Sequence, residues 1–222
     1  MMISPEAFYE MTLKGKTKEQ IMTVIRGLKQ EIGRLKNTLE HPDYKTKKSM
    51  RPSESTRIFC SRLYLERAKQ ALVEAGGEYI PSAAERKAME FDDNIPYINK
   101  VVFSIGGYFG GYKTNTYTVI DDKIYVSKEH SLDIEANDGH NSIEPLDTEE
   151  FLEQLESLHI GEWRKNYNTE RFGYTILDGT QWSLDIYYSN GHKSVEIYGS
   201  NAYPYNFDSA LELFGMETSG LV

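Results

Sequence analysis

Residues 178–207, DGTQWSLDIYYSNGHKSVEIYGSNAYPYNF, decide the fold of this protein. Apolar and polar side chains alternate between residues 181 and 188, and they do so again between residues 195 and 198. On an extended chain one face would hold Trp182, Leu184, Ile186 and Tyr188, and the other Gln181, Ser183, Asp185 and Tyr187. Because successive side chains of a strand point to opposite faces, the pattern predicts two strands, with Trp182 anchored in the core.

The residues around these two strands are typical of turns. Asp178 and Gly179 predict a turn before the first strand, and Ser189–His192, with its central Asn-Gly, predicts a tight type I′ hairpin. Asn201 lies in a polar turn after the second strand, and Pro204 ends the pairing. Most of the polar residues in this stretch therefore have a structural explanation.

The same period of two extends back to about residue 95 and defines the rest of this half of the chain. It predicts strands at 98–105, 116–120, 123–127, 132–135 and 171–177. Helices are predicted over 147–163, capped by Asp147 or Thr148, and over 207–215, capped by Asn206 or Asp208. Since mostly short turns join the strands, we expect an α+β fold: an antiparallel sheet with two helices on one face.

The N-terminal region predicts an antiparallel helical hairpin with coiled-coil character. Between residues 18 and 40 the apolar side chains repeat at spacings of three and four, as in a heptad: Ile21, Ile25, Leu28, Ile32, Leu35 and Leu39. Thr17 and Gln20 form a capping-box pattern, and Pro42 prevents easy continuation. A second helix, over about 54–75, pairs large side chains with small ones and ends at Gly76-Gly77. A third, short helix is expected after Pro81.

Charge supports a division into residues 1–94, a basic helical region, and residues 95–222, an acidic α+β domain. Residues 1–80 carry 15 Lys and Arg against 10 Asp and Glu, a net charge of +5. Residues 81–222 carry 10 against 24, a net charge of −14. Such asymmetry predicts two parts with different roles, or two parts that attract each other.

Several classes of site lack their sequence pattern. Cys60 is the single cysteine, so an intramolecular disulfide and a cysteine-based zinc site are excluded. The five histidines show no metal-binding spacing, and no nucleophile elbow or phosphate loop occurs. We expect no metal, cofactor or catalytic residue. With no apolar core of a signal peptide near the N-terminus and no long apolar run, we expect a cytoplasmic protein without a membrane span.

The motifs EW at 162–163, DGTQWSLDIYYSNG at 178–191 and GSNAYPYNF at 199–207 resemble those of uncharacterised bacterial proteins. This resemblance follows a GGYFGG segment at 106–111 and covers roughly residues 100–214, without the helical hairpin. It supports the C-terminal fold unit. It implies no activity and assigns no role to any residue.

Polar and aromatic residues near the predicted strand ends form a candidate binding surface. Its members are Trp163, Arg164, Tyr167, Asp178, Gln181 and Asn201. Tryptophan, tyrosine and arginine are the residue types that dominate binding hot spots. The structural alternative is that Trp163 and Tyr167 only seal the edge of the sheet.

These observations favour a non-enzymatic module that binds an as yet unidentified protein partner. The helical hairpin could also form a homo-oligomer. Two alternatives remain: an enzyme that uses the polar residues at the strand ends, and nucleic-acid binding through the basic hairpin loop. For the second alternative the candidate residues are Lys45, Lys47, Lys48 and Arg51. A solvated basic loop would have the same composition.

Overall fold

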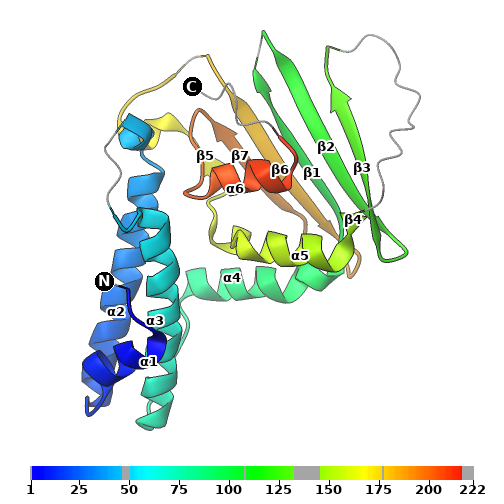
Figure 1. Cartoon of the computed structure of the whole chain (residues 1–222). Helices are drawn as coiled ribbons and strands as arrows, with labels where there is room; N and C mark the ends of the chain where they lie inside the picture. Colours follow the sequence, from blue (N-terminus) through cyan, green and yellow to red (C-terminus); the bar gives the residue numbers. More distant parts are fainter. Residues whose placement is uncertain (1, 47–50, 108, 133–145, 177, 217–222) are drawn as a thin grey trace. The chain divides into compact units, whose positions relative to one another are not determined.

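The computed structural model describes residues 2–46, 51–107, 109–132, 146–176 and 178–216. The chain forms two compact units, residues 1–81 and 82–222. Within the described residues, no helix is both long and apolar enough to cross a membrane. The α+β class expected from the sequence is confirmed, with helices before a seven-stranded sheet (Figure 1).

The first unit contains the predicted helical hairpin. Its long helices are α2 (Lys18–Leu39) and α3 (Glu54–Glu74), and its short elements are α1 (Pro5–Phe8), a π-helix (Tyr9–Leu13) and a 3-10 helix (Pro42–Thr46). The capping box of Thr17 and Gln20 starts α2, and the Ser53 side chain caps α3. Gly76 has a positive φ of 73° and ends α3, as expected for a glycine after a helix.

The apolar stripes of α2 and α3 are buried. Ile25 and Leu35 of α2 are 1% and 0% exposed, and Ile32 is 8% exposed, as is Leu65 of α3. The small side chains of Ser61 and Ala68 are buried in the alternate row of α3. This confirms the prediction that large side chains of one helix pack against small and large ones of the other.

The second unit begins with α4 (Ala83–Asn94), which starts at a capping box of Ser82 and Glu85. A Cβ on Gly161 would overlap Ala88 and Phe91, so α4 packs closely against the short 3-10 helix Ile160–Glu162. Because of this packing, α4 lies in the unit of the sheet, whereas the sequence division at residues 94 and 95 had grouped it with the hairpin.

One sheet organises the second unit, in the strand order β4-β3-β2-β1-β6-β7-β5. The strands are β1 (Ile98–Gly107), β2 (Gly111–Ile120), β3 (Lys123–His130), β4 (Leu146–Asp147), β5 (Asn166–Tyr167), β6 (Gln181–Tyr188) and β7 (Val195–Ser200). All neighbouring pairs are antiparallel except β5 and β7, which are parallel.

Two local predictions are wrong. The strand expected at 171–177 is absent from its described part: Thr169–Phe172 is a 3-10 helix, and residues 173–176 are irregular. The Asn190-Gly191 connection is not a type I′ turn, because only Gly191 has a positive φ and six residues separate β6 from β7. Instead, the two-residue turn Asp121-Asp122, with φ of 50° and 57°, has the positive values that type I′ requires. The strand expected at 132–135 lies largely outside the described residues.

The two faces of the sheet differ in what covers them. The helices α5 (Thr148–Ser157) and α6 (Phe207–Leu213) lie on one side of the sheet (Figure 1). Their apolar side chains join Trp182, Leu184 and Ile186 of β6 in one core. The residues that alternate with these along β6 point to the opposite face, and their side chains are polar or partly exposed, for example Ser183 and Tyr187. The alternation seen in the sequence therefore gives a buried face and an open face.

Candidate functional site

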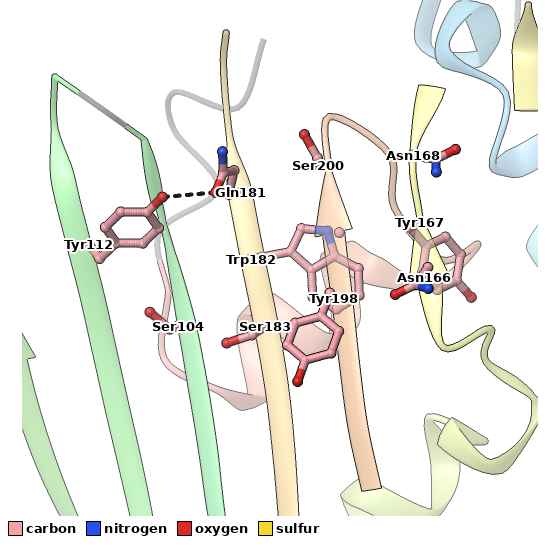
Figure 2. Close-up of a pocket in the computed structure, with 11 residues that line it drawn as sticks. Ser104, Tyr112, Asn166, Tyr167, Asn168, Gln181, Trp182, Ser183, Tyr198 and Ser200 are labelled. Carbon is pink, nitrogen blue, oxygen red and sulfur yellow. Dashed lines mark hydrogen bonds between the residues drawn. The ribbon is translucent and has the colours of Figure 1, made fainter. Parts of the chain in front are cut away.

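A hollow of about 510 Å³ lies on the open face, where β1, β6, β7 and β5 end together (Figure 2). It is lined by Ser104, Tyr112, Asn166, Tyr167, Asn168, Gln181, Trp182, Ser183, Tyr198, Gly199 and Ser200. Its volume falls within the range of small-molecule pockets. None of these lining residues carries a charge, so the hollow offers hydroxyl groups, amides and tyrosine rings.

The register of the sheet brings these residues together. Ser183 of β6 is paired with Ser104 on one side and with Tyr198 on the other. Gly106 lies between Gln181 and Tyr112 in the register, and a Cβ there would overlap the Gly111 backbone, so no side chain separates the two residues. The Tyr112 hydroxyl can therefore reach across and donate a hydrogen bond to Gln181 Oε1 at 3.1 Å (Figure 2).

Trp182 supports this region from the buried face. Its indole Nε1 donates to the Ala202 carbonyl oxygen at 3.0 Å, and its side chain is 3% exposed. A Cβ at the paired Gly199 would overlap the indole, so glycine is required there for the close approach. The ring also packs against Phe207, with a centroid distance of 4.8 Å. Trp182 is thus a core anchor, as predicted, and it fixes the two strands that carry the hollow.

Asp178 and Asn201 form a turn beside the hollow. The Asn201 Oδ1 atom accepts from the Thr180 backbone at 2.9 Å, and its Nδ2 donates to the Asp178 carbonyl oxygen at 3.1 Å. Asp178 Oδ1 accepts from the Gly179 backbone at 2.9 Å. Asn201 itself has a φ of 52°, a conformation that asparagine tolerates better than most residues. Through these hydrogen bonds both side chains stabilise the backbone of the turn.

The six sequence candidates therefore divide into four groups. Tyr167 and Gln181 line the hollow, and Asp178 and Asn201 hold the adjoining turn. Trp163 is 2% exposed, and its Nε1 donates to Asn206 Oδ1 at 3.1 Å. Arg164 is exposed, with its guanidinium 6.0 Å from the centre of the Tyr167 ring. The structure does not bring all six side chains into one surface.

Sequence reasoning missed most of the lining. The alternation of apolar and polar residues could have predicted that Ser183 and Tyr198 lie on the open face, because both fall opposite the apolar residues of their strand. No sequence pattern predicted Tyr112 and Asn166, since only the pairing of β2 with β1 and of β5 with β7 places them nearby.

Two carboxylates lie next to the hollow on the same open face. Asp185 and Glu196 are directly opposite each other in the register of β6 and β7. Partial burial, and secondly the charge of Glu196, raise the pKa of the Asp185 carboxyl. Tyr198 donates a hydrogen bond to Glu196 Oε2 at 3.3 Å. Partial burial and the neighbouring carboxylates also raise the pKa of the Tyr198 hydroxyl, which therefore stays protonated at neutral pH.

A second hollow, of about 560 Å³, is acidic. It is lined by Ile95, Pro96, Asp122, Asp147, Thr148, Glu149, Leu152, Glu153 and Glu156. Asp147 is occupied there as the N-cap of α5, with its Oδ1 accepting from the Glu150 backbone at 2.9 Å. In the described part of the chain, no three His, Cys, Asp or Glu side chains gather in a way that could hold a metal ion.

The basic loop is described only in part. Lys47 and Lys48 lie outside the described residues, and of Lys45 only the backbone, in the 3-10 helix Pro42–Thr46, is described. Arg51 is exposed. Nucleic-acid binding through this loop stays a prediction.

Comparison with known proteins adds no family to this description. No family model, no curated protein and no solved structure matches the chain. The resemblance to uncharacterised bacterial proteins also stays a prediction.

Proposed function

We propose that the protein is a non-enzymatic binding module whose second unit recognises a protein partner through the open face of its sheet. The observation that carries the proposal is the hollow, bordered by Tyr112 and Tyr198, next to side chains that the fold does not bury. Tyrosine supplies large contact area and a hydroxyl at a small entropic cost, and for this reason it is enriched in binding surfaces. Polar side chains between the rings can then fix the register of a partner.

The chemistry of the lining supports binding rather than catalysis. A catalytic site generally needs a titratable group with a suitable pKa inside a pocket that excludes water. The described side chains that line the hollow are hydroxyls, amides and aromatic rings, and the hollow is open along the face of the sheet. The same proposal places the protein in the cytoplasm, because a chain with one cysteine needs no oxidising compartment.

Site-specific photo-cross-linking in cells tests this proposal. A photoreactive phenylalanine analogue replaces Tyr198 in the full chain, and in a control chain it replaces Tyr97, which is 48% exposed and lies outside the strands. We expect a discrete protein adduct from position 198 and none of the same mass from position 97. The partner, identified by mass spectrometry and purified, should then bind the parent chain and lose affinity for Tyr112→Ala. Identical adducts at both positions, or none at 198, would contradict the proposal.

A further inference from the structure

Asp185 and Glu196 are an unfavourable pair within the isolated chain. In an antiparallel sheet, the side chains of directly opposed residues are about 4.5–5.5 Å apart at Cβ, and like charges in such positions destabilise the sheet. Within the described residues, no Lys, Arg or His nitrogen lies within ion-pairing distance of either carboxylate. The second unit is also strongly acidic, with 10 Lys and Arg against 24 Asp and Glu in residues 81–222.

Two exposed tyrosines flank this pair on the same face. Tyr187 is two residues after Asp185 on β6, and Tyr198 is two residues after Glu196 on β7. Because the strands are antiparallel, the two rings lie on opposite sides of the carboxylates, and they are 41% and 44% exposed. Tyr187 is diagonal to Glu196 and Tyr198 is diagonal to Asp185, so each ring is within reach of a long side chain placed over the carboxylates.

The face already holds one cation of its own beside an aromatic ring. The Lys100 ammonium lies 5.5 Å from the centre of the Tyr187 ring. A cation within about 6 Å of a ring face is attracted by the electrons of the ring. Asp185 is two residues before Tyr187 on the same face of β6. A cation placed there would be attracted by the tyrosine ring and would also pair with the carboxylates.

The hollow is contiguous with this arrangement. Tyr198 belongs to both, and Ser183 of the hollow is the next outward-facing residue before Asp185 on β6. A chain that places a cationic side chain over the carboxylates can therefore place its neighbouring residue in a hollow lined by neutral hydrogen-bonding groups. The hollow is an observation independent of charge, and it indicates a ligand longer than a single ion.

We propose that the open face docks a basic segment of the partner protein, with an arginine side chain of that segment between Tyr187 and Tyr198 and paired with Asp185 and Glu196. This inference rests on the proposed function and specifies the partner's chemistry. Arginine is favoured over lysine because its planar guanidinium can pair with two carboxylate oxygens at once and stack on tyrosine rings. The negative charge of the carboxylates and the neighbouring tyrosine rings both favour arginine.

Nuclear magnetic resonance titration of the isotope-labelled full chain tests the inference. The probes are N-acetyl-arginine amide and its neutral isostere N-acetyl-citrulline amide, and maltose is a neutral polar control. We expect saturable shifts of the backbone signals of Asp185, Tyr187, Glu196 and Tyr198 with the arginine probe. The citrulline probe should bind about fivefold to tenfold more weakly, since it keeps the shape but lacks the charge.

Variants separate the specific pair from general attraction to an acidic protein. Asp185→Asn and Glu196→Gln should each weaken the arginine probe about fivefold or more. Glu129→Gln is the matched control, because Glu129 is an exposed carboxylate on β3 and faces the same side of the sheet, opposite Thr114. This control should retain parental affinity.

Three results would overturn the inference: equal shifts with citrulline, equal weakening by Glu129→Gln, or shifts in the hollow with maltose and none with arginine. The proposed function is tested separately, by the cross-linking experiment. If a partner cross-linked at position 198 binds Asp185→Asn and Glu196→Gln as tightly as the parent, the binding module stands and the arginine contact is wrong.

Discussion

The helical hairpin and the sheet use their apolar residues differently. In the hairpin, the stripes of α2 and α3 bury each other, so that Ile25, Ile32 and Leu65 all have packing partners. In the described part of the sheet unit, helices cover one face, and the other face exposes tyrosines beside the opposed Asp185 and Glu196. Packing therefore explains the hairpin and one face of the sheet. It does not explain the open face, where two like charges oppose each other at a cost in stability.

The largest effect should come from the covered face of the sheet. Phe103 of β1 is 0% exposed, and its ring stacks on Phe214 at 4.8 Å between centroids. Phe103→Ala should lower the free energy of unfolding of the second unit by about 3–5 kcal/mol, from lost burial and the cavity left behind. Both tryptophans lie in this unit, so their fluorescence during urea unfolding reports it selectively.

Val102→Ala is the control, because the neighbouring side chain points to the open face and is only half-buried. Its effect should be much smaller. If both variants lost the same stability, the two faces of the sheet would not differ in the way that the comparison requires.

A second large effect is expected in the hairpin. Ile32→Ala should cost about 2–4 kcal/mol, because it removes a side chain that is 8% exposed between α2 and α3. Thermal unfolding followed by far-UV circular dichroism measures the loss of helix. Val73→Ala on α3, where the side chain is 63% exposed, should melt with the parent. An Ile32→Ala chain that melts like the parent would mean that the stripe does not stabilise the hairpin.

The turn beside the hollow should give an intermediate effect. Asn201→Ala removes two side-chain hydrogen bonds and puts alanine at a φ of 52°, at a cost of about 1–2 kcal/mol. Asn201→Gly keeps the backbone conformation accessible and isolates the effect of the lost hydrogen bonds.

Asp178→Ala, which removes a single exposed hydrogen bond, should cost less, about 0.5 kcal/mol. Unchanged fluorescence melts with lost partner binding would instead assign these two residues to the binding surface.

The sequence predicted the parts that follow from local periodicity. The heptad stripe of α2, the capping box at Thr17 and the alternation around Trp182 each involve neighbours along the chain, and all three are confirmed. The two-residue strands β4 and β5 were missed, because they carry too few residues to show a period. The predicted turn type was wrong because Asn190 lacks the positive φ that type I′ requires, although Gly191 has one, whereas Asp121 and Asp122 both have it.

The candidate site was predictable only in part for the same reason. Tyr167 and Gln181 were named from residue type and from their place near predicted strand ends; both border the hollow, but Gln181 is exposed whereas Tyr167 is only 3% exposed. Trp163 was also named from its type, but its indole is buried. The opposition of Asp185 and Glu196 depends on the register of β6 with β7, which the six-residue connection between the strands leaves undetermined in the sequence.

The smallest expected effect tests the central claim, that the open face keeps an unfavourable charge pair for a partner. Partial burial, and secondly the charge of Glu196, raise the pKa of Asp185 in the folded chain above its ordinary value of 3.8, so the folded state holds this proton more tightly than the unfolded state. Ionisation therefore destabilises the fold. The cost is absent below the ordinary pKa, grows as the pH rises through the raised pKa, and is fully present at neutral pH.

Urea unfolding of the parent and of Asp185→Asn, followed by tryptophan fluorescence, measures this cost most directly. At about pH 7 the variant should be more stable than the parent by about 0.2–1 kcal/mol, the usual size of a single cross-strand side-chain interaction in a sheet. At about pH 3, where the carboxyl is protonated, the two chains should unfold alike. A variant that is less stable than the parent at neutral pH would show that Asp185 stabilises the fold, and it would contradict the claim.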